Sequence, residues 1–186
     1  MEANRRAAID AALEVLTTFG ADGLTMQAVA SKADMSIRSL YNYFETRDRL
    51  LAEVFSALVG MTQHEVELRA PPDSDPLQRL EHFVAVHFDI LATQRRHMTV
   101  LLALRGVPEL EERVDAIRAW RHRTLLQLLR DCGLRGVARE RAAAAAFALT
   151  SFTSYTSLTD DLGLDQGETI KTVGQALTRL AGSPAN

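Results

Sequence analysis

The stretch "LTMQAVASKADMSIRSLYNYFETRDRLL", residues 24–51, contains two short helix patterns, each preceded by a hydroxyl residue. Thr25 and Ser36 stand at the positions where a side-chain oxygen can accept a hydrogen bond from an amide of the first helical turn. We therefore predict helices over residues 26–32 and 37–44, separated by a break at "ADM". A helix of eight residues is not stable alone, so the second helix must be held by packing.

The second predicted helix divides into an apolar side and a polar side. Its apolar residues recur at helical spacing, with Leu40 and Phe44 as the anchors against the preceding helices. The apolar residues are Ile37, Leu40, Tyr41 and Phe44; the polar residues expected to point outward are Arg38, Ser39 and Asn42, with Tyr43 beside them. Arginine can pair with guanine and asparagine with adenine in a major groove, and the free amides at both helix starts can bind phosphate. The alternative is a generic helix pair with a solvated polar face, because such pairs are common.

The sequence on both sides of this stretch predicts further helices and no strands. A helix over residues 4–19 ends at Gly20, and another begins near residue 46 or 47 and continues to about residue 68. The segment "RAPPDSDP" contains three prolines and is the only clear linker. Beyond it the periodicity predicts five helices, over residues 77–95, 97–105, 108–132, 139–162 and 166–180.

Composition excludes several classes of protein. The chain has 186 residues, of which 47% are hydrophobic and 24% charged, an ordinary globular composition. The longest apolar run, residues 142–149, is far shorter than the roughly 20 residues of a membrane-spanning helix, and no signal-peptide core follows the N-terminus. Cys132 is the single cysteine, which rules out an internal disulfide and favours a reducing cytoplasm.

The charge balance restricts how this chain could bind DNA. The net charge is −3, and within the first 50 residues seven acids outnumber six cations. The cations are Arg5, Arg6, Lys32, Arg38, Arg47 and Arg49. Because there is no global attraction for phosphate, binding must come from the local placement of a few cations.

Residues 3 to about 61 resemble the N-terminal domain of the tetracycline-repressor (TetR) family. The resemblance rests on "AALEVLTTFGADGLTMQAVASKADMSIRSLYNYFETRDRLLAEVF", in which several family features occur in order over about 45 positions. It implies an all-α fold, with a three-helix helix-turn-helix DNA-binding domain joined by a long helix to a C-terminal helical ligand-binding and dimerisation domain. The expected domains are residues 2–62, with the motif at 25–44, and residues 63–186.

The resemblance also implies roles for individual residues. Thr25 would bind phosphate as the cap of its helix, Ser36 would cap the recognition helix, and Arg47 would touch phosphate at the head of the next helix. The base-facing positions are Ile37, Arg38, Ser39 and Asn42, and the expected backbone contacts are Tyr41 and Tyr43. This sequence departs from the family at Asp34, where a glycine is usual, at Ile37, where a basic residue is usual, and at Arg38, where a small residue is frequent. The operator sequence therefore cannot be taken over from relatives.

The C-terminal part offers candidates for a ligand pocket between helices. They are Phe83, His87, Met98, Trp120, Phe147, Phe152 and Tyr155. The alternative for each is an ordinary core position, because helical bundles use the same residue types. No two of the five histidines are spaced i, i+4, so we expect no metal site, and we expect no cofactor. Cys132 is interpreted as a small apolar filler.

Two further features of the C-terminal part allow two interpretations each. Residues 140–163 and the last helix suit a homodimer interface through the last two helices, and a buried internal helix is the alternative. The apolar residues of the last helix are Ile170, Val173, Ala176, Leu177 and Leu180. Residues 95–141 contain eleven arginines and six acids, which favours solvated helix faces over a second nucleic-acid surface.

Taken together, the sequence predicts a cytoplasmic, ligand-responsive transcriptional regulator. We expect a repressor that binds a palindromic double-stranded DNA operator as a homodimer and is released by a small molecule. No catalytic triad, metal spacing or phosphate loop is visible, so an enzyme is disfavoured. The alternative is a helical small-molecule-binding or interaction protein that does not bind DNA.

Overall fold

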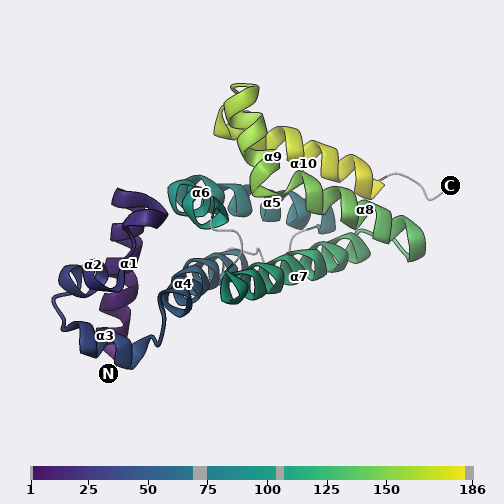
Figure 1. The fold of residues 1–186 in the computed structure, drawn as a ribbon. Helices are drawn as coiled ribbons and strands as arrows, with labels where there is room; N and C mark the ends of the chain where they lie inside the picture. The colour runs from purple at the N-terminus through teal and green to yellow at the C-terminus, as the bar shows by residue number, and fades with distance from the viewer. Residues whose placement is uncertain (1, 69–74, 104–106, 183–186) are drawn as a thin grey trace. The chain divides into compact units, whose positions relative to one another are not determined.

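The computed structural model describes residues 2–68, 75–103 and 107–182 (Figure 1). Every element in these ranges is helical, and no strand forms within them, which confirms the all-α prediction. The elements are α1 (Glu2–Gly23), α2 (Met26–Lys32), α3 (Ile37–Tyr43), α4 (Arg47–Leu68), α5 (Pro76–Thr93), α6 (Arg95–Ala103), α7 (Pro108–Asp131), α8 (Gly136–Leu149), α9 (Phe152–Thr156), a π-helical turn η1 (Ser157–Asp161) and α10 (Gln166–Gly182). Of the expected linker, residues 69–74 lie outside the described residues.

The chain forms two compact units. The first contains residues 1–61 with residues 94–116, and the second contains residues 62–93 with residues 117–186. Helices α4 and α7 each contribute residues to both units. The first unit thus includes α6 and the start of α7, which a single boundary at residue 62 would assign to the C-terminal part. The predicted division into a DNA-binding and an effector domain stays a prediction.

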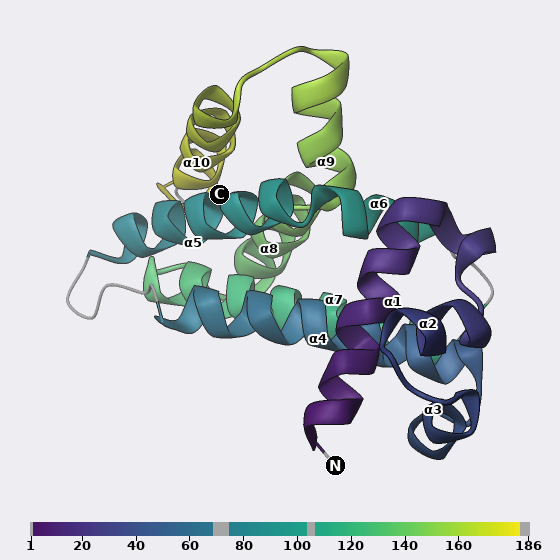
Figure 2. The same ribbon diagram turned by 90° about the vertical axis from the view of Figure 1, so that its left-hand side faces the viewer.

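In the first unit, α1 supports the helix pair α2 and α3. The buried face of α1 includes Ile9, Ala12 and Leu16, and α2 packs against both α1 and α3 (Figure 2). The expected break at Gly20 is present, since its φ of 72° interrupts the helical path. The chain nevertheless makes another helical turn to Gly23 before α2 begins.

The start of α4 is fastened to the same unit by polar contacts as well as by burial. Arg5 of α1 donates to a carboxylate oxygen of Glu53 at 2.6 Å, and its guanidinium lies 5.6 Å from the centroid of the Phe44 ring. The buried face of α4 contains Leu50, Leu51, Val54 and Phe55. Arg5 thus links α1 both to α4 and to Phe44, the residue that ends α3.

The core of the second unit is built on α5 and α10, which pack against each other. Val173 and Leu177 of α10 are buried in this core, at 2% and 0% exposure. These two residues were candidates for a dimer interface. Their burial within the chain agrees with the alternative, in which this face of α10 packs internally. Their periodic spacing serves the packing of α10 on α5, so it carries no information about a partner chain.

The single helix expected over residues 139–162 is interrupted. Thr150 ends α8, and the Ser151 hydroxyl caps α9 by accepting a hydrogen bond from the Ser154 amide at 3.0 Å. A serine side chain that bonds to a nearby amide offers the backbone an alternative to the continuous helix. The alanine-rich run before the break strongly favours helix, so a single continuous helix was predicted there.

Candidate nucleic-acid interface and ligand-binding region

Both predicted helix caps are present. The Thr25 hydroxyl accepts from the Ala28 amide at 3.1 Å, and the Ser36 hydroxyl accepts from the Ser39 amide, also at 3.1 Å. The Ser36 and Ser39 hydroxyl oxygens are 2.8 Å apart, so these two side chains also bond to each other. The starts of α2 and α3 therefore keep further amides free at exposed positions, where helix ends attract anions.

The turn between α2 and α3 depends on a left-handed residue. Asp34 has φ 50°, the only positive φ of a non-glycine residue in the described part of the chain. The next residue, Met35, donates its amide to the Ala30 carbonyl at 3.0 Å, which closes the end of α2. Aspartate tolerates this conformation better than most residues but less well than glycine.

Replacing Asp34 with glycine is expected to raise the free energy of unfolding by about 0.5–1 kcal/mol, because glycine adopts positive φ without a steric cost. Denaturant unfolding of the full chain would measure the change. Asp34→Asn is the control, since it removes the same charge but keeps a side chain. Equal stabilisation by both variants would assign the gain to the charge and contradict the backbone argument.

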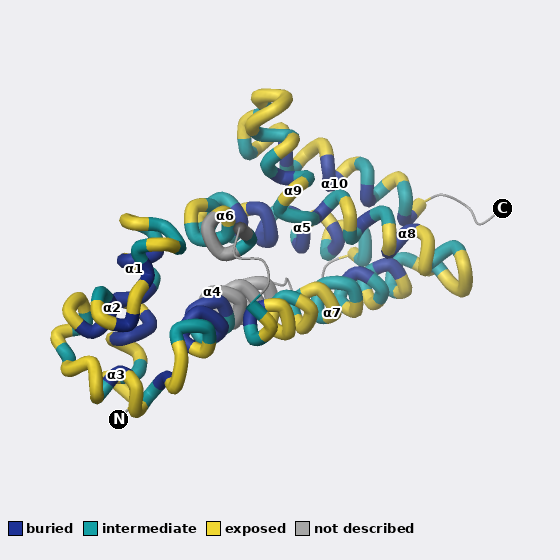
Figure 3. The backbone as a smooth tube through the Cα atoms, in the orientation of Figure 1, coloured by how far each residue is buried: buried dark blue, intermediate teal, exposed yellow. Residues whose placement is uncertain are grey.

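The exposed face of α3 differs from the predicted one. Ile37 and Tyr41 are 39% and 47% exposed, so they do not belong to the packed side, and only Leu40 of the helix is fully buried. Successive helix residues are turned by about 100°, which places Ile37 and Tyr41 on one face with the exposed Arg38 and Asn42. Figure 3 shows α3 as largely exposed. Ser39 and Tyr43, which were expected to point outward, are half-buried at the edge of this face.

Most cations near this face are already paired, and Arg38 is not. Lys32 forms an ion pair with Glu14 at 2.5 Å, and Arg6 lies 3.6 Å from Asp10. Arg38 is exposed and has no ion-pair partner among the residues that the structure describes. Arg49 at the start of α4 is also exposed and without an ion-pair partner among the described residues, although it was not predicted as a DNA contact. The Thr46 hydroxyl caps α4 by accepting a hydrogen bond from the Arg49 amide. The position of Arg49, three residues after this cap, was the only feature of the sequence that could have indicated it.

Arg47 donates hydrogen bonds to backbone carbonyls within the first unit. Its Nε donates to the Leu24 carbonyl at 2.8 Å and its Nη2 to the Ala21 carbonyl at 2.7 Å, while Nη1 lies 3.6 Å from Asp48. The side chain thus ties the start of α4 to the turn before α2. The phosphate contact expected of Arg47 stays a prediction; its side chain is 37% exposed.

In the second unit, three helices meet at one backbone carbonyl. The Thr150 carbonyl accepts from Nε2 of His87 on α5 at 2.9 Å and from Nη1 of Arg121 on α7 at 3.2 Å. Because a carbonyl only accepts, the neutral His87 ring carries its proton on Nε2, and its Nδ1 is a buried acceptor without a partner in the structure. Burial, then the charge of Arg121, lowers the pKa of His87 to about 4.

The candidates for a ligand pocket do not all lie in the same unit. Phe83 stacks on His87 at a centroid distance of 5.5 Å, and the Arg121 guanidinium lies 4.1 Å from the Phe147 ring centroid. Phe83, His87 and Tyr155 are buried, and Trp120, Phe147 and Phe152 are half-buried, all in the second unit. Met98 lies on α6 in the first unit, so the structure does not group it with the others. Sequence alone could not reveal this because it does not say which helices pair.

The structure also bears on the predictions for Cys132, for a metal site and for a membrane span. Cys132 is a half-buried free thiol, and burial raises its pKa, which suits an unreactive filler. Among the described residues, no cluster of three or more His, Cys, Asp or Glu side chains could hold a metal ion. No helix in the described ranges combines the length and the apolar character needed to cross a bilayer.

A short capped helix with exposed arginine and asparagine, held on two supporting helices, has the arrangement of a helix-turn-helix domain. Residues 8–54 match the family described as "Bacterial regulatory proteins, tetR family". Over 43 residues the chain is 51% identical to an uncharacterised HTH-type transcriptional regulator of Xanthobacter autotrophicus, which covers 23% of this chain and 21% of the relative. The match to the tetR family thus covers the N-terminal part of the chain, residues 8–54.

The sequence relatives are matched over part of their length, whereas the fold is matched throughout. Alignments with three curated relatives span 21%, 49% and 36% of those proteins. A TetR-like transcriptional regulator from Rhodococcus sp. RHA1 has a TM-score of 0.76 at 18% identity, covering 98% of both chains. The regulator FadR from Bacillus subtilis, solved with stearoyl-CoA, has a TM-score of 0.74 at 21% identity, covering 93% of this chain and 97% of its own. These likenesses establish the all-helical fold beyond the N-terminal domain.

Proposed function

We propose that the chain is a ligand-responsive transcriptional regulator that represses by binding a palindromic DNA operator. The observation that carries this proposal is the exposed face of α3, where Arg38, which has no ion-pair partner within the described ranges, stands beside Asn42. Both side chains are suited to bidentate pairing with bases, and Ile37 can contact a thymine methyl. The chain as a whole does not attract phosphate, because its net charge is −3. The capped starts of α2 and α3, together with Arg49, would provide the phosphate contacts locally.

Binding to a palindrome requires two copies of the reading helix at a fixed separation. A homodimer places them in successive major grooves about 34 Å apart. We propose that the dimer forms through exposed positions of the last two long helices, α8 and α10, because the buried residues of α10 are already used within the chain. The protein would act in the cytoplasm, where its DNA target lies.

The effector would bind in the second unit, near the residues around His87. FadR from B. subtilis is described with stearoyl-CoA bound, which makes a small-molecule effector a reasonable expectation for this fold. An effector that prefers a dimer with another separation of the reading helices would reduce the DNA-competent population. To shift that population from 99:1 to 1:99, it must prefer the other state by about 10⁴-fold. We propose no catalytic role.

Selection of bound duplexes from a random library, followed by binding measurements at several salt concentrations, tests this proposal. A regulator of this kind is expected to select a sequence with two-fold symmetry and to lose affinity steeply as salt rises, since bound phosphates release counterions. The alternative, a helical ligand-binding or interaction protein without DNA, predicts no enriched sequence. Enrichment of an asymmetric site would argue against the dimeric arrangement.

A further inference from the structure

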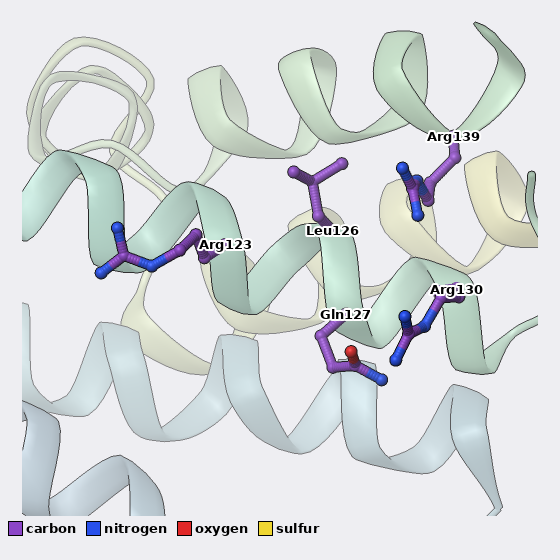
Figure 4. Close-up of a pocket in the computed structure, with 5 residues that line it drawn as sticks. All are labelled: Arg123, Leu126, Gln127, Arg130 and Arg139. Atoms are coloured by element: carbon purple, nitrogen blue, oxygen red, sulfur yellow. The ribbon is translucent and has the colours of Figure 1, made fainter. Parts of the chain in front are cut away.

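A small hollow lies between α7 and α8 in the second unit, and arginines dominate its walls. Its volume is about 200 Å³, and its lining residues are Arg123, Leu126, Gln127 and Arg130 of α7 with Arg139 of α8 (Figure 4). The four α7 residues are spaced i, i+3, i+4 and i+7, so they share one helix face. No acidic residue is among the five that line the hollow.

Two of the three guanidinium groups extend over this hollow from different helices. Figure 4 shows Arg139 extending from α8 towards α7, on the side of Leu126, and Arg130 extending from α7 beside Gln127. Arg123 directs its guanidinium away along α7, so it contributes mainly its aliphatic stem. Nε of Arg139 is buried and has no hydrogen-bond partner in the structure.

The charge of these arginines is poorly balanced by the protein itself. Arg130 has no ion-pair partner among the described residues. Arg139 pairs through Nη2 with Glu140 at 2.8 Å, but that carboxylate is half exposed, and such surface pairs contribute little. Asp131, the other nearby acid, is engaged by Arg79 at 3.4 Å and by the Gln127 amide at 2.7 Å.

The start of α8 adds to the positive potential. Arg139 lies near the first turn of this 14-residue helix, whose N-cap residue, Arg135, makes no side-chain cap. The Arg135 guanidinium instead donates to the carbonyls of Arg130 and Leu134, at 2.6 and 2.8 Å. The free amides of a helix start carry partial positive charge, which favours an anion there.

We propose that this hollow binds a phosphate group of a small anionic molecule. Two guanidinium groups from different helices can each donate two hydrogen bonds to phosphate oxygens, a geometry for which arginine is better suited than lysine. The volume is below the roughly 300–1,000 Å³ of pockets for drug-sized ligands, so it fits a head group rather than a whole hydrophobic effector. The site is separate from the DNA-reading face and does not depend on the proposed operator binding.

Calorimetric titration of the full chain with inorganic pyrophosphate, at ionic strength held constant with potassium chloride, tests the proposal. We expect saturable binding at one site per chain. The double variant Arg130→Gln/Arg139→Gln is expected to bind pyrophosphate at least tenfold more weakly, because each charge-assisted hydrogen bond contributes about a factor of ten. Arg141→Gln is the matched control, since it removes an exposed arginine of α8 that does not line the hollow.

Wild-type affinity in Arg141→Gln, together with weakened binding in the double variant, supports the site. Equal weakening in both variants would show a non-specific charge effect and overturn it. So would an undiminished affinity in the double variant, or the absence of saturable binding by wild type up to about 10 mM, where non-specific ion pairing already contributes. If only duplex DNA, and not pyrophosphate, responds to the double substitution, the surface is a nucleic-acid contact and the proposal is wrong. Circular dichroism confirms that each variant is folded.

Discussion

The double variant Arg38→Ala/Asn42→Ala is expected to bind the duplex selected by wild type at least about a hundredfold more weakly. Each bidentate contact to a base contributes roughly 1–3 kcal/mol, and the variant removes two from each reading helix. Both side chains are exposed, so their loss leaves the packing of Leu40 and Phe44 intact. Fluorescence anisotropy with a labelled duplex measures the affinity, and thermal unfolding confirms the fold.

Two single variants separate base reading from general attraction. Arg49→Ala is expected to weaken binding to all sequences alike and to reduce the salt slope by about two, as the loss of one phosphate contact from each protomer of the proposed dimer should. Lys171→Ala, which removes an exposed cation of α10 in the second unit, is expected to leave affinity unchanged. If Arg38→Ala/Asn42→Ala bound the selected duplex as tightly as wild type, the assignment of α3 as the reading helix would be wrong.

Lowering the pH from 6.5 towards 4 is expected to destabilise the protein by roughly 3 kcal/mol through His87 alone. Its pKa falls from 6.5 in the unfolded chain to about 4 in the fold, because burial and then Arg121 oppose the charged ring. Between these values the unfolded chain binds the proton that the folded chain excludes. Stability from this residue is therefore complete above pH 6.5 and decreases as the pH falls.

The variant His87→Gln tests this pH dependence, since glutamine can still donate to the Thr150 carbonyl but does not titrate. Urea unfolding between pH 7 and pH 4 should show a shallower loss of stability in the variant than in wild type, with the carboxylates contributing to both. Parallel curves would contradict the argument. An NMR titration of the His87 ring in the wild-type chain gives an independent measurement if the variant is too unstable.

Local chemistry allowed much of the first unit to be predicted. The hydroxyls of Thr25 and Ser36 act on amides only three residues away, so sequence spacing was enough to place both caps. The same is true of Gly20 and Asp34, whose positive φ follows from the conformations that these residue types tolerate. The helix of residues 37–44 was also placed to within one residue.

Long-range contacts account for what was missed. The donors of Arg47 meet carbonyls 23 and 26 residues away in the sequence, and no local pattern indicates such a contact. The helical spacing grouped Ile37 and Tyr41 with the apolar residues, whereas their exposure agrees with the DNA-facing positions that the family resemblance implies. The hollow beside Arg139 likewise depends on the pairing of α7 with α8, which the arginine count over residues 95–141 could not specify.

The two carbonyls held by Arg47 have a consequence for how a signal could travel. Arg47 donates hydrogen bonds to backbone carbonyls ahead of α2, and Arg5 of α1 binds Glu53 further along α4. The start of α4 is therefore attached at two points to the N-terminal helices. If the proposed effector acts through α4, we expect these contacts to persist, so that amide protons of α1 near Ala21 exchange no faster when the effector binds.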